Sequence, residues 1–82
     1  MIVKYFAWLK NITNREEEII DNKEIVDVET LKKFLINKYP KLKKYMKNDD
    51  IIRVAINLEY IVTNKSIDPN DEVALFPPVS GG

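Results

Sequence analysis

One helical pattern stands alone among short strand-like runs, and it limits the fold of this chain more than any other feature. Apolar residues recur in it at three- and four-residue spacing, the repeat of a helix with one buried face. These residues are Val28, Leu31, Phe34, Leu35 and Tyr39. Asp27 comes just before them and is the predicted N-cap, because its carboxylate can accept from the free N–H groups of a first turn. Pro40 disfavours helical geometry at the residue before it, so the helix is predicted to end at Tyr39.

Five further segments have the length and the β-branched or aromatic content of strands. They are residues 2–9, 16–20, 51–57, 60–63 and 72–76. Turn-forming Asn, Asp and Pro residues separate them. These turns are predicted at residues 11–14, 21–22, 48–50, 57–59 and 68–71. A short helical turn is also expected after Pro40, with Leu42, Tyr45 and Met46 on one side.

Alternation along the first predicted strand assigns its two faces. The face that holds Lys4 is expected to be the less buried one, and it carries Ile2, Phe6 and Trp8. The face expected to line the core carries Val3, Tyr5, Ala7 and Leu9. The same alternation gives residues 51–57 one apolar face, made by Ile52, Val54 and Ile56.

The order of these segments is two strands, a helix and three strands, which predicts a two-layer α+β domain with the helix on one face of the sheet. A single domain of 82 residues buries only about 60–65% of the surface of its unfolded chain. It has room for one modest core. A cavity enclosed by this chain alone is therefore not expected, and chemistry is expected at a surface, a terminus or a shared interface.

The composition excludes several common kinds of active site. The chain has no Cys and no His, which removes disulfides, thiolate nucleophiles, the usual general base and most transition-metal sites. Lys plus Arg equal Asp plus Glu at 13 each, so no overall field favours nucleic acid or anionic lipid. No apolar run approaches the roughly 20 residues of a membrane span. With no signal-peptide pattern at Met1, a cytoplasmic protein without metal, membrane or nucleic-acid partners is expected.

Both glycines of the chain stand at its end, in the sequence Pro77-Pro78-Val79-Ser80-Gly81-Gly82. Glycine suits backbone that passes close to another molecule, so this placement indicates a tail that threads into a partner. The two prolines fix φ and lack N–H donors, so they resist extension of the sheet. Six extended residues can reach roughly 20 Å. The alternative is an inert chain end, because termini tolerate change.

The ending, residues 71–82, reads Asp-Glu-Val-Ala-Leu-Phe-Pro-Pro-Val-Ser-Gly-Gly. It resembles, almost residue for residue, that of the small sulfur-carrying subunit of molybdopterin synthase, a β-grasp family related to ubiquitin. Supporting matches are Tyr5-Phe6-Ala7, Asp27-Val28 with Leu31, and Val54-Ala55-Ile56-Asn57. The resemblance implies a ubiquitin-like β-grasp domain over residues 1–76, with a mixed sheet of about five strands and one main helix on one face. It also implies a flexible, reactive tail over residues 77–82.

The resemblance further implies a reaction cycle at Gly82. An ATP-dependent activating enzyme would adenylate the terminal carboxylate, and a sulfur donor protein would convert the transient acyl-adenylate to a thiocarboxylate. The tail would then enter the large subunit of molybdopterin synthase and pass sulfur to cyclic pyranopterin monophosphate, giving the dithiolene of molybdopterin. In the family, two large and two small subunits form a heterotetramer. The chain would be a carrier with no permanently bound cofactor, and not a complete catalyst.

The sequence departs from the family pattern at two turns. Asn70 stands where the family usually has Gly, and it is interpreted as a local replacement because Asn tolerates left-handed geometry. Leu58 is bulkier than usual for its hairpin, which leaves the geometry of that turn open.

Three aromatic residues are candidates for contact with a partner, since such residues anchor interfaces. Phe76 adjoins the tail and is expected to serve as an anchor if its side chain points away from the core. Phe6 and Trp8 share the less buried strand face, and are expected either to meet a partner or to be covered within the domain.

Two runs of charge are given structural interpretations. The lysines around Tyr39 and Tyr45 are interpreted as a solvated basic face and not as a nucleic-acid patch. They are Lys38, Lys41, Lys43, Lys44 and Lys47. Glu16, Glu17 and Glu18 are interpreted as an exposed acidic strand edge.

Other functions stay open beside molybdenum cofactor synthesis. The same activated tail could be attacked by an amine, which would make the chain a ubiquitin-like modifier of lysines. A sulfur carrier for thiamine or for tRNA thiolation is less similar in the stretch from Pro77 to Ser80. A β-grasp binding module with an inert tail is the last alternative.

Overall fold

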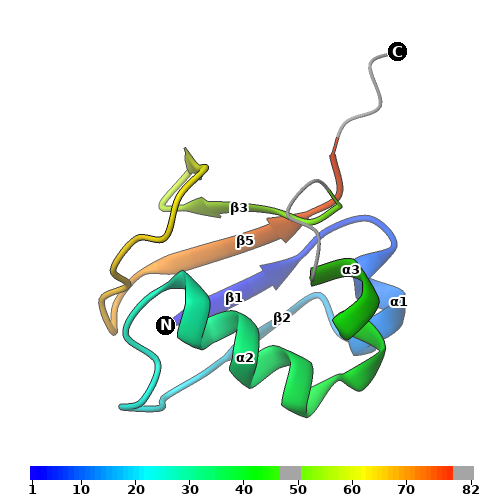
Figure 1. The fold of residues 1–82 in the computed structure, drawn as a ribbon, viewed down its shortest axis with the longest axis horizontal. Helices are drawn as coiled ribbons and strands as arrows, with labels where there is room; N and C mark the ends of the chain where they lie inside the picture. The colour runs from blue at the N-terminus through cyan, green and yellow to red at the C-terminus, as the bar shows by residue number, and fades with distance from the viewer. Residues whose placement is uncertain (47–50, 79–82) are drawn as a thin grey trace.

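A computed structural model describes residues 1–46 and 51–78 of the chain. Within these residues one mixed sheet carries five strands, in the spatial order β2-β1-β5-β3-β4. The strands are β1 (Ile2–Tyr5), β2 (Glu17–Ile19), β3 (Arg53–Ile56), β4 (Glu59–Ile61) and β5 (Glu72–Phe76). β1 and β5 are parallel, and the other neighbours are antiparallel. The predicted two-layer α+β architecture is confirmed, because the main helix lies across one face of the sheet (Figure 1).

The main helix is α2 (Val28–Lys38), and both of its predicted ends are confirmed. Thr30 N donates to Asp27 Oδ1 over 2.8 Å, and Thr30 in turn accepts from the Asp27 backbone N–H in a capping box. Tyr39 is the C-cap, immediately before Pro40. The expected helical turn follows as η1 (Pro40–Leu42) and α3 (Lys43–Met46). The turn predicted at residues 48–50 lies outside the described residues.

The prediction of a strand over residues 2–9 is wrong beyond Tyr5. Ala7 has φ 55°, which turns the backbone away from the sheet, and a short helix, α1 (Leu9–Thr13), begins two residues later. Leu9 is fully buried as expected, but it reaches the core from this helix. Ala7 is exposed, so its predicted place in the core is also wrong. The prediction failed because residues 2–9 form one apolar run, and a helix as short as α1 buries too few residues to show helical spacing in the sequence.

The core lies between the sheet and the helices, and strand alternation builds it as predicted. The buried strand residues include Val3, Tyr5, Val54, Ile56, Val73 and Leu75. Val28, Leu31 and Leu35 of α2 pack against them, and Leu42 and Met46 close one end. Each fully buried Leu or Val contributes roughly 1.5–3 kcal/mol relative to exposure.

Glu18 corrects the interpretation of residues 16–18 as an exposed edge, because it is only 6% exposed. Its carboxylate accepts from Tyr5 Oη at 2.5 Å, Tyr39 Oη at 2.6 Å and Lys38 Nζ at 2.5 Å. Burial alone would raise the pKa of Glu18, but the hydrogen bonds from Lys38, Tyr39 and Tyr5 outweigh it and hold that pKa below the usual range of a glutamate. The group therefore stays charged and joins β1, β2 and the end of α2.

Replacement of this carboxylate is expected to be costly. Glu18→Gln removes the charge of a buried carboxylate that accepts three hydrogen bonds, so the free energy of unfolding should fall by about 1.5–3 kcal/mol, as measured by urea denaturation at neutral pH. Because the folded-state pKa is lowered, this stability is present above the unfolded pKa and is lost as pH falls through the folded pKa. The difference in free energy of unfolding between wild type and Glu18→Gln should therefore become smaller at acidic pH, as the Glu18 carboxylate of wild type is protonated. Glu17→Gln, at the exposed neighbour, is the control and should change little.

The hairpin between β3 and β4 turns through Asn57 and Leu58, whose φ values are 51° and 71°. Two positive φ angles in succession are the geometry of a type I′ turn, which favours Asn and Gly. The Asn57 side chain ties this turn to β5: its Oδ1 accepts from Glu72 N, and its Nδ2 donates to Asp71 Oδ1. Leu58 is 89% exposed and makes no compensating contact within the core. The turn therefore has type I′ geometry, and the bulky Leu58 adopts a strained left-handed backbone conformation in it.

Asn70 does not adopt the left-handed backbone geometry that was used to explain it as a replacement for Gly. Among the described residues, positive φ occurs at Ala7, Asn14, Asn57 and Leu58. The predicted turn at residues 68–71 is present all the same. Asp71 N donates to the Asp68 carbonyl over 3.0 Å, and Asp68 N donates to Asp71 Oδ2 over 2.8 Å.

Leu58→Gly is expected to stabilise the fold. A residue with a side chain costs about 1–2 kcal/mol in left-handed geometry, and Gly avoids this cost. Gly also makes the unfolded chain more flexible, which offsets part of the benefit. The free energy of unfolding should therefore rise by about 0.5–1 kcal/mol in denaturant titrations. Val62→Gly is the matched control, because Val62 is also an exposed apolar residue but lacks positive φ. It should lower stability. Equal effects of the two changes would contradict the strain at Leu58.

Candidate functional site at the C-terminal end of the sheet

The last strand, β5, is central in the sheet and ends at Phe76, where the chain leaves the domain (Figure 1). Pro77 is half-buried and Pro78 is exposed, and neither extends the strand. The remaining predicted tail residues, Val79, Ser80, Gly81 and Gly82, lie outside the described residues. The site described below is therefore the surface from which the tail starts.

The face of the sheet opposite α2 surrounds this exit. Strand register places the residues of this face: Ala55 lies opposite Ala74 on β5 and opposite Tyr60 on β4. Val54 and Leu75, one position along, are buried on the helix side. Small side chains at the centre keep the open face shallow, so aromatic rings at its rim are accessible.

Three of those rings form an aromatic patch, consisting of Phe6, Tyr60 and Phe76. The rings of Tyr60 and Phe76 have centroids 6.3 Å apart and are tilted by 48°. Phe6 N donates to the Leu75 carbonyl over 3.0 Å, which fixes Phe6 beside the end of β5. Phe6 is 46% and Tyr60 49% exposed. Phe76 is half-buried on this open face, so the condition set for it as a candidate anchor is met.

Trp8 does not share a face with Phe6. The turn at Ala7 sends it to the other side of the molecule, where its ring lies 4.8 Å from that of Tyr45 on α3. The expected pairing of Phe6 and Trp8 on one strand face is therefore wrong. Tyr60, in contrast, was missed as a site residue, because only the register of β3 with β4 brings it to Phe76.

Charged side chains border the aromatic patch. Arg53 lies opposite Phe76 in the register of β3 and β5, and in the described part of the chain it makes no ion pair with a carboxylate. Lys4 and Glu72 pair over 3.4 Å farther along the same face. An arginine beside exposed rings suits recognition of a carboxylate on a partner, since its planar donors bind such groups in a fixed geometry.

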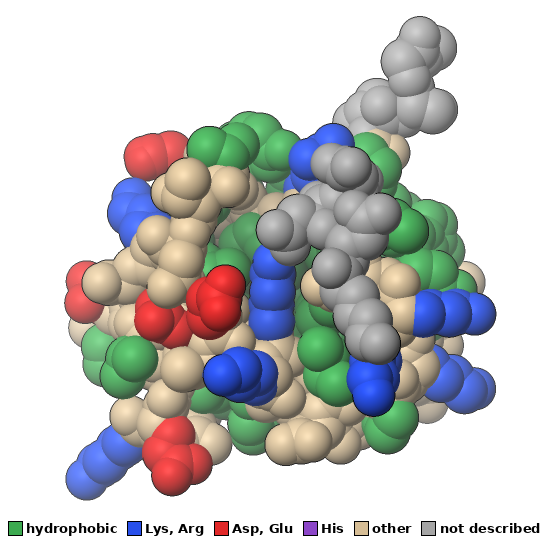
Figure 2. Space-filling model, in the orientation of Figure 1, with side chains coloured by type: hydrophobic (Ala, Val, Ile, Leu, Met, Phe, Trp, Pro, Cys, Tyr) green, Lys and Arg blue, Asp and Glu red, His purple; other side chains and the backbone are tan. Residues whose placement is uncertain are grey.

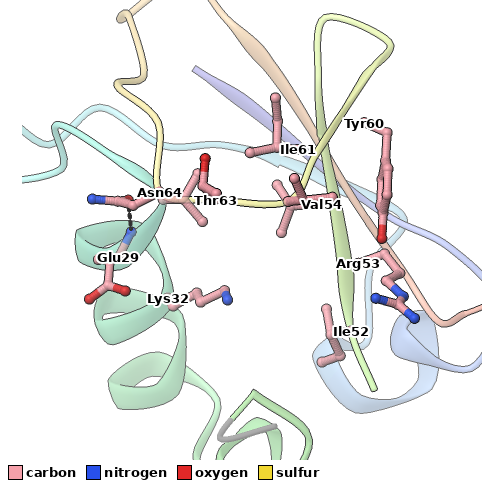
Figure 3. A pocket seen from close by; sticks show the side chains of 11 residues that line it. Glu29, Lys32, Ile52, Arg53, Val54, Tyr60, Ile61, Thr63 and Asn64 are labelled. Carbon is pink, nitrogen blue, oxygen red and sulfur yellow. Dashed lines mark hydrogen bonds between the residues drawn. The ribbon is translucent and has the colours of Figure 1, made fainter. Parts of the chain in front are cut away.

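A separate pocket of about 250 Å³ lies between α2 and the β3–β4 hairpin (Figure 3). Lys32 reaches toward it from α2, whereas Arg53 projects from β3 on the side of Tyr60, and Glu29 N donates to Asn64 Oδ1 over 3.0 Å at the border of the pocket. In residues 1–46 and 51–78 no group of three or more potential metal ligands occurs, and no helix has the length and apolarity needed to cross a membrane.

Comparison with known proteins places the chain in a family. The model of the ThiS family matches residues 3–82, which is all of the chain except its first two residues. The chain belongs to the ThiS family. Among its curated relatives, the molybdopterin synthase sulfur carrier subunit of Caenorhabditis elegans is 31% identical, over 98% of this chain and 94% of the relative.

Solved structures of similar proteins have the same fold. A protein of Pyrococcus furiosus assigned as subunit 1 of a molybdopterin converting factor superimposes with a TM-score of 0.81 at 28% identity, over 95% of each chain. SAMP1, a small archaeal modifier protein from Haloferax volcanii, gives 0.82 at 31% identity, over 100% of this chain and 98% of its own. One chain from a complex of subunits 1 and 2 of the Helicobacter pylori molybdopterin-converting factor superimposes with a TM-score of 0.65 at 22% identity, over 99% of this chain and 96% of its own. This similarity shows the fold alone. The predicted ubiquitin-like β-grasp fold is confirmed for this ThiS family member.

Proposed function

We propose that this chain is the sulfur carrier subunit of a molybdopterin synthase, working through the carboxylate of Gly82. The observation that carries the proposal is the ending of the chain: a central strand that stops at Phe76, two prolines that leave the sheet, and a terminal Gly81-Gly82. The curated relative from Caenorhabditis elegans, a named sulfur carrier subunit, aligns with nearly the whole chain. The absence of Cys and His from the sequence fits a carrier whose reactive group is the main chain itself.

The chemistry assigned to Gly82 proceeds by acyl transfer. The carboxylate attacks the α-phosphorus of ATP, releases pyrophosphate and becomes an acyl-adenylate. Hydrosulfide delivered by a donor protein then attacks the acyl carbon, the bond from that carbon to the oxygen of AMP breaks, and a thiocarboxylate and free AMP remain. Each thiocarboxylate gives up one sulfur and returns to a carboxylate, so the two sulfurs of the dithiolene need two loaded tails.

The aromatic patch is the surface on which partners would be held during these steps. Phe6 and Tyr60 are large and exposed, and they lie with the half-buried Phe76 near the start of the tail, so the patch has the aromatic composition that is typical of an interface anchor. The ATP-dependent activating enzyme and the large synthase subunit both need the tail in their active sites, so they would use this surface in turn. A tail of six extended residues reaching roughly 20 Å would then meet a pocket in either partner.

Intact-mass measurement tests the carrier chemistry. After incubation with a ThiS-family activating enzyme, ATP and a sulfide source, the chain should gain the mass that corresponds to replacement of one oxygen by sulfur. Deletion of Gly82, or addition of one residue after it, should abolish the gain, because the reactive carboxylate is then misplaced. The last strand ends at Phe76, six residues before Gly82, so circular dichroism and thermal unfolding of these variants should match wild type. Full loading of the deletion variant would contradict the proposal.

The aromatic patch gives a second test, with binding as its measurement. Tyr60→Ser should weaken binding to the large synthase subunit by about 30-fold or more in calorimetric titrations, because truncated interface anchors cost about 2 kcal/mol or more. Leu58→Ser is the matched control, since Leu58 is also an exposed apolar residue but lies at the far end of the hairpin. An equal loss of affinity in Tyr60→Ser and Leu58→Ser would show that Tyr60 is not an anchor of this interface.

A second candidate function is favoured by the similarity to SAMP1, whose Haloferax volcanii structure superimposes with a TM-score of 0.82 at 31% identity. A modifier would use the same acyl-adenylate, but an amine of a target lysine would displace AMP and leave an isopeptide bond at Gly82. Recovery of the chain joined to lysines in cells would support this function. Conversion of cyclic pyranopterin monophosphate after addition of the large subunit would support the first and separate it from other sulfur pathways.

A further inference from the structure

A groove lies between α1 and the η1–α3 turn, on the helix side of the domain and away from the aromatic patch. It is lined by Ile12, Pro40, Lys41, Lys43, Lys44 and Tyr45. Its floor is apolar, because Ile12 and Tyr45 are half-buried there and Trp8 packs on the Tyr45 ring at 4.8 Å. Lysines form its rim. The groove thus combines an apolar floor with positive charge.

The positive charge is local and uncompensated. Lys41, Lys43 and Lys44 are all exposed, and in the described residues none of them makes an ion pair with a carboxylate. The chain as a whole has zero net charge, so charge is unevenly distributed over the surface. Figure 2 shows Lys and Arg side chains spread over that face, including its right edge on the side of α3, whereas the acidic side chains drawn there lie in its left and lower part.

We propose that this groove binds an acidic peptide segment of a protein partner, with one apolar side chain of the segment seated on Ile12 and Tyr45. Carboxylates of the segment pair with Lys41, Lys43 and Lys44, which supply three cations around a floor large enough for a leucine or phenylalanine. Complementary charge determines which segments bind and how fast they associate, and the buried apolar side chain contributes most of the affinity.

A nucleic acid fits this groove less well than an acidic peptide. The Tyr45 ring already packs against Trp8, and the Lys44 ammonium lies 5.1 Å from its centroid, so a base has no free ring face on which to stack flat, whereas an aliphatic side chain needs only the accessible edge of the ring together with Ile12. The balanced net charge also gives no long-range attraction to a phosphate backbone. Three lysines can neutralise the few carboxylates of a short acidic segment, which carries less charge than a nucleic-acid backbone.

The groove lies at the same end of the molecule as Phe76, the last residue of β5. β1 and β5 are parallel and end side by side, with Phe6 N donating to the Leu75 carbonyl, and Trp8 follows two residues later. A partner that holds the tail can therefore reach the groove at the same time. The binding itself does not depend on the chemistry of Gly82, so it can be tested apart from the proposed function.

Trp8 provides the measurement, because it is the single tryptophan of the chain and packs on the groove floor. The full chain would be titrated with a short synthetic peptide of glutamate and aspartate around one leucine, and Trp8 fluorescence followed. Binding should saturate and should weaken with salt, since exposed ion pairs are screened. The double variant Lys41→Glu/Lys44→Glu should bind about tenfold more weakly or worse, while Lys23→Glu, an exposed lysine away from the groove, should bind as wild type.

Three comparison ligands decide the chemistry of the occupant. A peptide with every acid replaced by its amide should lose binding, and one with leucine replaced by serine should bind more weakly. Equal binding of the amide peptide would overturn the proposal. So would tighter binding of single-stranded DNA or of phosphatidylserine vesicles than of the acidic peptide, and so would wild-type affinity in the Lys41→Glu/Lys44→Glu variant.

Discussion

The pairing of the last strand between β1 and β3 is the interaction on which the rest of the structure depends. It places Val73 and Leu75, both almost fully buried, at the centre of the core, and it joins the N-terminal and C-terminal parts of the chain. A central strand cannot fray without exposing both neighbours, so the point at which the chain leaves the domain is fixed. A tail that must enter another protein's pocket benefits from such a rigid base, because only the tail itself then needs to be ordered on binding.

Glu18 shows how the fold accommodates charge in its interior. Edge strand β2 has only three residues, and its buried carboxylate is held by Tyr5, Lys38 and Tyr39 from two other elements. A buried ion pair gives little net stability compared with apolar packing, but removal of one partner is costly. The cluster thus ties the edge strand to the end of α2 in a single arrangement.

Two surfaces of different chemistry flank the tail exit. The aromatic patch lies on the open face of the sheet, and the lysine-rimmed groove lies on the helix side, beside α1 and α3. Both lie near the end of the parallel pair of β1 and β5, because the chain turns at Ala7 as soon as β1 ends. Partners that act on the same tail can therefore be distinguished by which of the two surfaces they engage.

The sequence by itself determined the features that depend on local chemistry. Asp27 and Pro40 define the helix, residues 72–76 form a strand with the predicted bounds, and the terminal residues carry the resemblance to the family. Tertiary structure alone decided the rest. It made Glu18 a buried group, took Trp8 out of the strand and brought Tyr60 next to Phe76. Strand order and register set these contacts, and both arise from pairing between residues far apart in the chain, which periodicity within one segment does not encode.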